Sequence, residues 1–170
     1  MNPTHAPTIA VLGLGVMGTV FVRRAREAGL LVTAWDRAQG AAAGDAVRDA
    51  DLVVTVLYDA DAVLSVMRAA VPAMQPHATW LQMSTIGVEG TRRAVDLAAT
   101  RPGVGFLDAP VSGTKTVAEH GGLVVFASGD RARMDVAQPF LSALAEKVHW
   151  MGEAGAGTRA GLLFNAGSRS

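Results

Sequence analysis

The chain has 170 residues, of which half are hydrophobic; 15 Lys or Arg balance 15 Asp or Glu, and cysteine is absent. This length suits one domain with a substantial core, and a net charge of zero gives no electrostatic footprint for nucleic acid or an anionic membrane. The lack of cysteine excludes disulfides, thiol catalysis and cysteine metal sites.

A Gly-x-Gly-x-x-Gly turn follows the first apolar run, Thr8 to Leu12. Between a strand and a helix, such a turn predicts the phosphate-binding loop of a dinucleotide-binding βαβ unit, because the unpaired N–H groups and the positive end of the helix face the phosphates. We expect Gly13 to permit the tight turn, Gly15 to let the pyrophosphate approach, and Gly18 to let the helix pack closely. The predicted cofactor loop comprises Gly13, Leu14, Gly15, Val16, Met17 and Gly18.

An acid ends the second apolar run, at Asp36. At the end of the second strand its carboxylate would accept hydrogen bonds from an adenosine ribose and repel a 2′-phosphate, which favours NAD over NADP. The next residue, Arg37, leaves NADP possible, because an arginine there can clamp a 2′-phosphate. It can equally lie over the adenine or remain solvated. The glycines could also form a purely structural turn. Such a turn would not need the flanking strand and helix, the second strand and the terminal acid, so the full combination favours cofactor binding.

The rest of the chain alternates strands and helices, although the segment between Asp36 and Leu52 is too short for a further strand with its crossover helix. We therefore predict an α/β fold, with a Rossmann-type, doubly wound, mainly parallel sheet that lacks one βα unit. The predicted domains are residues 1–155, which bind dinucleotide, and residues 156–170, which start an interdomain helix that stops after about two turns. Strands are expected at 52–57, 78–83, 104–107, 123–127 and 147–150, and helices at 59–70, 88–99 and 130–145.

Ligands of a doubly wound sheet bind beyond the carboxyl ends of its strands. The loops expected there are 13–18, 57–59, 84–86 and 108–114. A ligand over the cofactor would meet Ser84, Thr85 and Ser112, and the backbone N–H groups around Gly113 can hold a carboxylate. Alternatively, Ser84 and Thr85 cap the next helix and Ser112-Gly113 is only a turn.

The four histidines, at positions 5, 77, 120 and 149, have no metal-ligand spacing, so no metal site is expected. No apolar run approaches the roughly 20 residues of a membrane span, and the amino terminus does not resemble a secretory signal. We therefore expect a cytoplasmic protein that binds neither membrane nor nucleic acid.

Taken together, three loops resemble those of the β-hydroxyacid dehydrogenase family, which includes 3-hydroxyisobutyrate dehydrogenase, 6-phosphogluconate dehydrogenase and the glyoxylate/succinic semialdehyde reductases. The cofactor loop, Ser84-Thr85-Ile86 and the substrate signature Asp108-Ala-Pro-Val-Ser-Gly113 carry the resemblance. The run from Ser112 to Glu119 is most similar to the glyoxylate/succinic semialdehyde reductases. The resemblance implies a Rossmann-type domain joined by a long helix to a helical second domain, which this chain lacks.

The resemblance also implies roles for individual residues. Leu57 and Thr85 would border the cofactor, while Ser112, Gly113 and Thr114 would hold the carboxylate of a small substrate. Asn165 matches the family's active-site asparagine. Four residues earlier the family has its proton-shuttling lysine, and this chain has Gly161, which has no proton to give. Lys115 could replace that lysine only weakly as a proton donor. The alternative is that Lys115 is a solvated cation in a loop.

We therefore expect an NAD(P)-dependent oxidoreductase that transfers hydride between nicotinamide and a small hydroxy acid or aldehyde acid, with weak or no activity in this chain alone. A non-catalytic dinucleotide-binding module is the alternative. A second alternative is an imine reductase, whose relatives also replace the lysine, although the signature at Asp108–Gly113 suits a carboxylate. A homo-oligomer is possible, because the face near Leu162, Leu163 and Phe164 would lack its partner domain.

Overall fold

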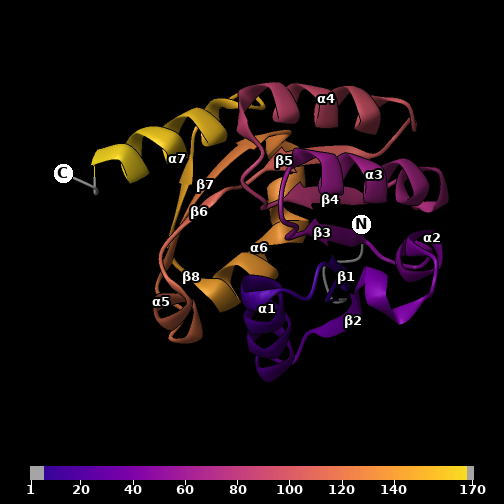
Figure 1. Cartoon of the computed structure of the whole chain (residues 1–170), viewed down its shortest axis with the longest axis horizontal. Helices are drawn as coiled ribbons and strands as arrows, with labels where there is room; N and C mark the ends of the chain where they lie inside the picture. The colour runs from indigo at the N-terminus through magenta and orange to yellow at the C-terminus, as the bar shows by residue number, and fades with distance from the viewer. Residues whose placement is uncertain (1–5, 168–170) are drawn as a thin grey trace.

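The computed structural model describes residues 6–167 and places a twisted sheet between two layers of helices (Figure 1). His5 and residues 168–170 of the predicted final helix lie outside the described residues. The strands are β1 (Thr8–Leu12), β2 (Leu31–Trp35), β3 (Leu52–Thr55), β4 (Thr79–Gln82), β5 (Gly105–Asp108), β6 (Val111–Ser112), β7 (Leu123–Gly129) and β8 (Ala145–Trp150). The α-helices are α1 (Val16–Glu27), α2 (Ala43–Val47), α3 (Ala60–Ala70), α4 (Gly87–Ala99), α5 (Lys115–Glu119), α6 (Met134–Leu144) and α7 (Ala156–Gly167).

The described strands form one sheet in the order β2-β1-β3-β4-β5-β7-β6, with β8 also paired to β7. Strands β2 to β5 in this order are parallel, whereas β7 runs antiparallel to β5 and β6. The predicted α/β class and the mainly parallel, doubly wound sheet are confirmed. The short strand β6 and helix α5 were not predicted, because residues 111–119 lack the length and periodicity that identify an element.

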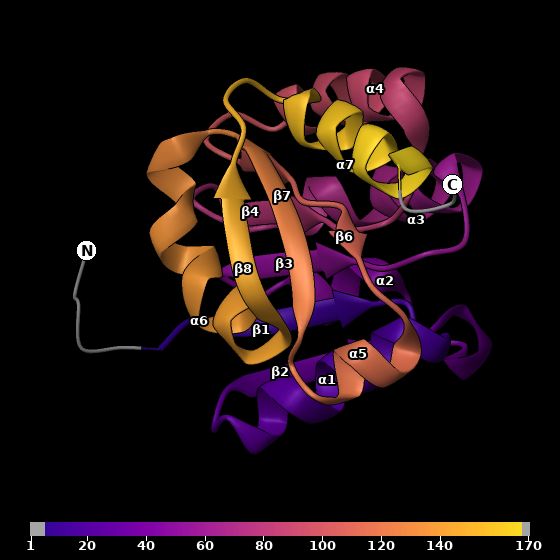
Figure 2. The ribbon, with the colours of Figure 1, turned by 90° about the vertical axis from the view of Figure 1, so that its left-hand side faces the viewer.

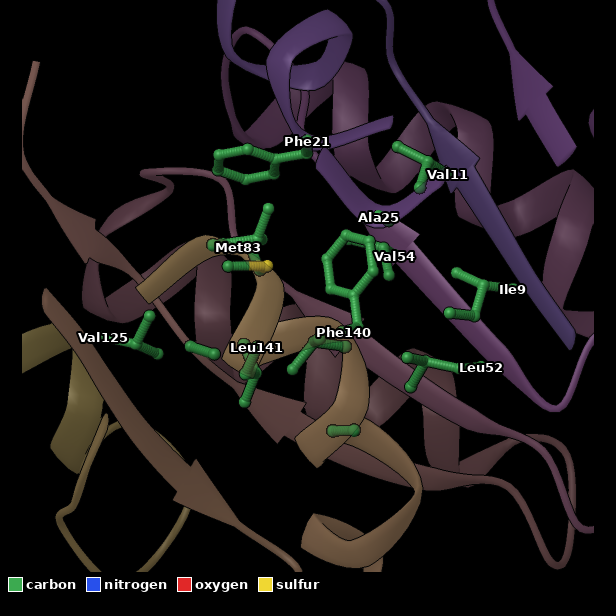
Figure 3. Packing of buried hydrophobic residues seen from close by; sticks show 14 of the residues in the cluster. Ile9, Val11, Phe21, Ala25, Leu52, Val54, Met83, Val125, Phe140 and Leu141 are labelled. Carbon is green, nitrogen blue, oxygen red and sulfur yellow. The ribbon is translucent and has the colours of Figure 1, made fainter. Parts of the chain in front are cut away.

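The two faces of the sheet bury separate apolar clusters, one under α1 and α6 and the other under α2, α3 and α4. In the first cluster the rings of Phe21 on α1 and Phe140 on α6 meet edge to face, with their centroids 6.4 Å apart (Figure 3). Strands β3 and β4 are fully buried and mainly apolar, without the alternation of a half-exposed strand, and their polar residues Thr55, Thr79 and Gln82 are buried as well.

Strand β2 lies at the edge of the sheet, as the missing βα unit requires. Between β2 and β3 the chain forms only a 3₁₀ turn, η1 (Arg37–Gln39), and the five-residue helix α2. The prediction that this unit is missing is therefore confirmed. The exposed edge is partly covered by Arg26, whose Nη2 donates to the carbonyl oxygen of Val32 at 3.0 Å.

The other predicted elements occur with ends shifted by a few residues, with two differences in the second half of the chain. The helix expected from residue 130 begins as a 3₁₀ turn, η3 (Arg131–Arg133), and continues as α6. The final helix was expected to stop after about two turns, but α7 has 12 residues, about three turns. It starts one residue after the tight Gly155 turn, whose φ is 97°.

Arg133 joins the amino ends of β4 and β5. Its Nη1 donates to the carbonyl oxygen of His77 at 2.8 Å, and its Nη2 donates to that of Gly103 at 2.6 Å. We expect Arg133→Met to lower the free energy of unfolding by about 2–4 kcal/mol, because several hydrogen bonds from a charged, mostly buried donor are lost. Chemical denaturation measures this change. The control Arg23→Met removes an exposed arginine with a 3.8 Å ion pair to Glu27, and equal losses in both variants would contradict the assignment.

Candidate cofactor and substrate site

Two glycines of the cofactor loop are required by close backbone contacts. Gly13 has φ 117°, and a Cβ there would collide with the carbonyl oxygen of Val56 after β3. A Cβ on Gly18 would collide with the carbonyl oxygen of Gly13. The turn off β1 and the first turn of α1 are therefore pressed together, as predicted from the glycine spacing.

Gly15 serves a different purpose, because it is exposed and a Cβ there would meet no atom within 4 Å. Gly15 is the N-cap of α1, so no side chain caps the helix, and its first turn contains no acid. By contrast, Asp59 caps α3 by accepting from the N–H of Ala62 at 2.8 Å. The amino end of α1 is thus open to an anion, and the unpaired N–H groups there could hold a dinucleotide pyrophosphate. Leu14 and Met17 are half-buried against the core, while Val16 is 64% exposed.

Asp36 lies beside this loop, because Trp35 pairs in register with Leu12 and accepts from the N–H of Gly13 at 2.9 Å. The carboxylate of Asp36 accepts from the N–H of Ala38 at 2.8 Å, which caps η1. Arg37 is exposed and reaches α3, where its Nη2 lies 3.4 Å from the Oγ of Ser65. Both residues are thus at the carboxyl end of β2, where an adenosine ribose would bind.

A buried polar network links the loops that follow β3 and β4. Ser84 Oγ accepts from the N–H of Leu57 at 2.7 Å and donates to the carbonyl oxygen of Thr55 at 3.2 Å. The side chain of Gln82 joins the network by accepting from the N–H of Ser84 at 2.8 Å. Leu57 and Thr85 are therefore held in place by groups beneath them.

These contacts correct both interpretations of Ser84. The residue is 4% exposed, so it does not face a ligand, and Ile86 rather than Ser84 is the N-cap of α4. Thr85 is exposed at the top of the same loop. Gln82 was not predicted as part of the site, although one signal was available: it is a polar residue at the end of a buried strand.

The substrate signature and α7 meet at Ser112, whose Oγ donates to Oδ1 of Asn165 at 2.8 Å. Figure 2 shows α7 running across the ends of β7 and β6, which brings these distant residues together. Gly113 has φ 142°, and a Cβ there would press on Leu123. Thr114 is exposed and caps α5 by accepting from the N–H of Val117 at 3.3 Å. Ser112-Gly113 is therefore more than a turn, because it pairs with Asn165.

The two candidate positions for a proton donor differ in their surroundings. Gly161 is buried, and a Cβ there would lie 3.4 Å from Pro110 and 3.8 Å from Phe126, which is ordinary contact. Lys115 was predicted to lie in a loop, but it is the first residue of α5. Its exposed Nζ lies 3.6 Å from Oε1 of Glu119. Lys115 is thus engaged in a surface ion pair.

Neither a metal-ligand cluster nor a membrane-spanning helix is found within the described residues. No group of three or more His, Asp or Glu residues in the range 6–167 is placed to hold a metal ion. Over the same range, no helix has both the length and the apolar character needed to cross a membrane.

Comparison with known proteins agrees with this geometry. Residues 8–152 match the family described as the NAD binding domain of 6-phosphogluconate dehydrogenase. A probable 3-hydroxyisobutyrate dehydrogenase of Mycobacterium tuberculosis is 34% identical over 171 residues, which cover 93% of this chain and 58% of that protein. Glyoxylate/succinic semialdehyde reductase 1 of Arabidopsis thaliana is 28% identical over 173 residues, which cover 92% of this chain and 60% of that protein.

A solved structure gives the same result. Mycobacterium tuberculosis 3-hydroxyisobutyrate dehydrogenase, described with L-serine, matches with a TM-score of 0.88 and 33% identity over 95% of this chain and 60% of that chain. The present chain thus spans about 60% of the length of these relatives. The predicted resemblance is confirmed: the chain belongs to the β-hydroxyacid dehydrogenase family, and its residues 8–152 form the family's NAD-binding domain.

Proposed function

We propose that the chain is the cofactor-binding part of an NAD-dependent oxidoreductase that acts on a small hydroxy acid or aldehyde acid. The observation that carries this proposal is the contact between Ser112, in the substrate signature loop, and Asn165 on α7. At the carboxyl end of β1 in the same sheet, the uncapped amino end of α1 is open to an anion. Relatives named as 3-hydroxyisobutyrate dehydrogenase and glyoxylate/succinic semialdehyde reductase support the substrate class. We also propose that residues 1–155 are the dinucleotide domain and that residues 156–170 begin an interdomain helix.

In this proposal each group of residues has one task. The N–H groups at the start of α1 bind the pyrophosphate, and Asp36 binds the adenosine ribose. Leu57 and Thr85 exclude water from the nicotinamide side, where NAD supplies or accepts the hydride. Ser112, Gly113 and Thr114 bind the substrate carboxylate, and Asn165 orients the substrate from α7.

The test measures binding and turnover separately. NADH binding is followed by fluorescence titration, and NADH oxidation is followed with glyoxylate and with succinic semialdehyde; NAD reduction is followed with 3-hydroxyisobutyrate and with L-serine. We expect NADH to bind and turnover to be slow or undetectable. Absence of binding at millimolar NADH and NADPH would refute the proposal, and turnover like that of an ordinary enzyme would refute the predicted weakness.

The second candidate function is a dinucleotide-binding module without catalysis. Gly161 favours it, because this position has no proton to give and Lys115 is paired with Glu119. Binding of NADH without detectable turnover of any of the four substrates, in the wild type and also in Gly161→Lys, supports this candidate, whereas slow turnover of one of them supports the oxidoreductase. An imine reductase is less well supported, because Ser112 and Gly113 lie in a signature that suits a carboxylate.

We expect Asp36 to determine the choice between NAD and NADP. Replacing Asp36 with serine removes a carboxylate that repels a 2′-phosphate, so affinity for NADPH should rise by about 10- to 100-fold while affinity for NADH falls. Titration with both cofactors measures this change. The control Asp45→Ser removes an exposed acid on α2. A wild-type protein that prefers NADPH would contradict the assignment and would instead favour a phosphate clamp at Arg37.

We further propose that the chain self-associates through α7. Leu162, Leu163 and Phe164 are 46%, 76% and 49% exposed, so α7 presents large apolar side chains that association would bury. Sedimentation velocity should show a concentration-dependent dimer, and Leu163→Glu should give a monomer. A wild-type protein that stays monomeric at high concentration would contradict this proposal.

A further inference from the structure

A row of buried polar side chains crosses the carboxyl ends of four neighbouring strands. Thr55 pairs in register with Gln82, Gln82 with Asp108, and Asp108 with Ser128. All four residues are 0% exposed. Burying polar groups in a mainly apolar sheet costs free energy unless the groups are hydrogen-bonded, so each of these side chains is expected to have a hydrogen-bond partner. The first two belong to the network beneath Leu57 and Ser84 described above.

The other two, Asp108 and Ser128, form a socket for the first turn of α7. Oδ2 of Asp108 accepts from the backbone N–H of Thr158 at 2.8 Å and from its Oγ1 at 2.7 Å. Ser128 Oγ accepts from the N–H of Gly157 at 2.9 Å. A Cβ on Gly157 would collide with the carbonyl oxygen of Phe126, so the helix is seated directly against β7.

These contacts at the first turn of α7 determine where Asn165 lies. Thr158 is in the first turn of α7, and Asn165 lies about two helical turns further on. Thr158 is 5% exposed, and its Oγ1 also lies 3.2 Å from Oγ1 of Thr91 on α4. A small change of angle at the first turn would therefore displace Asn165 from Ser112.

We propose that Asp108 is a positioning residue that docks the amino end of α7 and thereby sets the distance between Ser112 and Asn165. Asp108 acts as a helix cap supplied by a strand, because its carboxylate satisfies a backbone N–H that the helix itself leaves unbonded. That this distance serves substrate binding rests on the proposed function, whereas the docking itself does not.

Burial of the Asp108 carboxyl makes the stability of the folded chain depend on pH. Burial raises the pKa of the Asp108 carboxyl, while the hydrogen bonds from Thr158 and the guanidinium of Arg159 act in the opposite direction. Oδ1 has no hydrogen-bond partner among the described residues. Relative to the unfolded chain, in which the carboxyl has its ordinary value of 3.8, the raised pKa means that Asp108 stabilises the folded chain most at low pH, and that this contribution is lost as the pH rises through the raised pKa.

The experiment measures amide hydrogen exchange of α7 by mass spectrometry, with rates corrected for the intrinsic effect of pH. In Asp108→Leu the acceptor is lost, and exchange in residues 156–165 should become about 10- to 100-fold faster. Asp108→Asn keeps an acceptor without ionising. Because the amide oxygen can still accept from Thr158, protection of α7 should stay close to that of the wild type and well above that of Asp108→Leu.

A milder variant keeps the test decisive if Asp108→Leu does not fold. Thr158→Val preserves the backbone donor and the side-chain volume but removes Oγ1, so exchange in α7 should become about 3- to 10-fold faster. Wild-type protection in Thr158→Val, or equal losses in the Asn and Leu variants, would overturn the proposal. NADH binding is measured in parallel, because failure of the wild type to bind NADH counts against the proposed function and leaves the docking of α7 untouched.

Discussion

Replacing Gly161 with lysine is expected to raise the turnover number for glyoxylate or succinic semialdehyde by about 10²- to 10⁴-fold, the range that a positioned general acid typically supplies. Reduction of an aldehyde leaves an oxygen that must take up a proton as the hydride arrives. At position 161 the wild-type chain has no side chain at all. An ammonium group there would supply that proton from the position to which the family resemblance assigns the proton-shuttling lysine.

The surroundings of Gly161 can accept a larger side chain at its base. A Cβ would lie in ordinary contact with Pro110 and Phe126, at 3.4 and 3.8 Å. Because Gly161 is inside α7, lysine or methionine there also gains helix propensity, of the order of 0.5–1 kcal/mol relative to glycine. The substitution should therefore not unfold the helix that carries Asn165.

Gly161→Met is the matched control, because methionine is also long and unbranched but cannot donate a proton. Both variants should bind NADH as the wild type does, and only the lysine variant should show faster NADH oxidation, measured by absorbance at saturating substrate. If the two variants turn over equally slowly although both bind NADH, proton supply is not what limits this chain, and the role assigned to this position is wrong.

The second large effect concerns the cofactor loop, where Gly15→Val should raise the dissociation constant of NADH by about 10- to 100-fold while costing at most about 1 kcal/mol of stability from the poorer helix N-cap. The reason is steric and local. A Cβ at Gly15 meets no protein atom, and its φ of −71° is allowed for any residue. The added methyl groups would instead occupy the space in which the pyrophosphate approaches the N–H groups of α1.

Gly18→Ala is the contrasting variant of the same loop. Its Cβ would collide with the carbonyl oxygen of Gly13, so the protein itself should be destabilised, whether or not NADH is present. Thermal unfolding without cofactor and fluorescence titration with NADH separate the two effects. Wild-type affinity in Gly15→Val would show that the dinucleotide does not bind beside Gly15, which would remove the basis of the cofactor assignment.

Much of the fold could be predicted because it depends on local patterns. The glycine spacing, the helical periodicity of α1 and α3, and the mainly apolar runs at β3 and β4 each indicate an element without reference to the rest of the chain. The missing βα unit could also be predicted, because a strand with its helix needs a minimum length and the segment after Asp36 does not have it.

The errors fall where the outcome depended on residues far apart in the chain. Ser84 was expected to face a ligand or cap a helix, but its hydroxyl bonds Leu57 and Thr55, more than 25 positions away. Lys115 was placed in a loop because a five-residue helix capped by Thr114 leaves little periodic signal. The direction of β7, antiparallel to β5, follows from how the sheet closes and has no local signature.

By itself, the sequence determined the cofactor loop, the parallel core of the sheet and the order of its loops at the carboxyl edge, because turns, periodicity and strand ends are set by neighbouring residues. Only the tertiary structure decided that Ser112 meets Asn165 and that Asp108 receives the first turn of α7. Those contacts join residues about 50 positions apart, and their geometry is the outcome of packing α7 against β7, which no short stretch of sequence encodes.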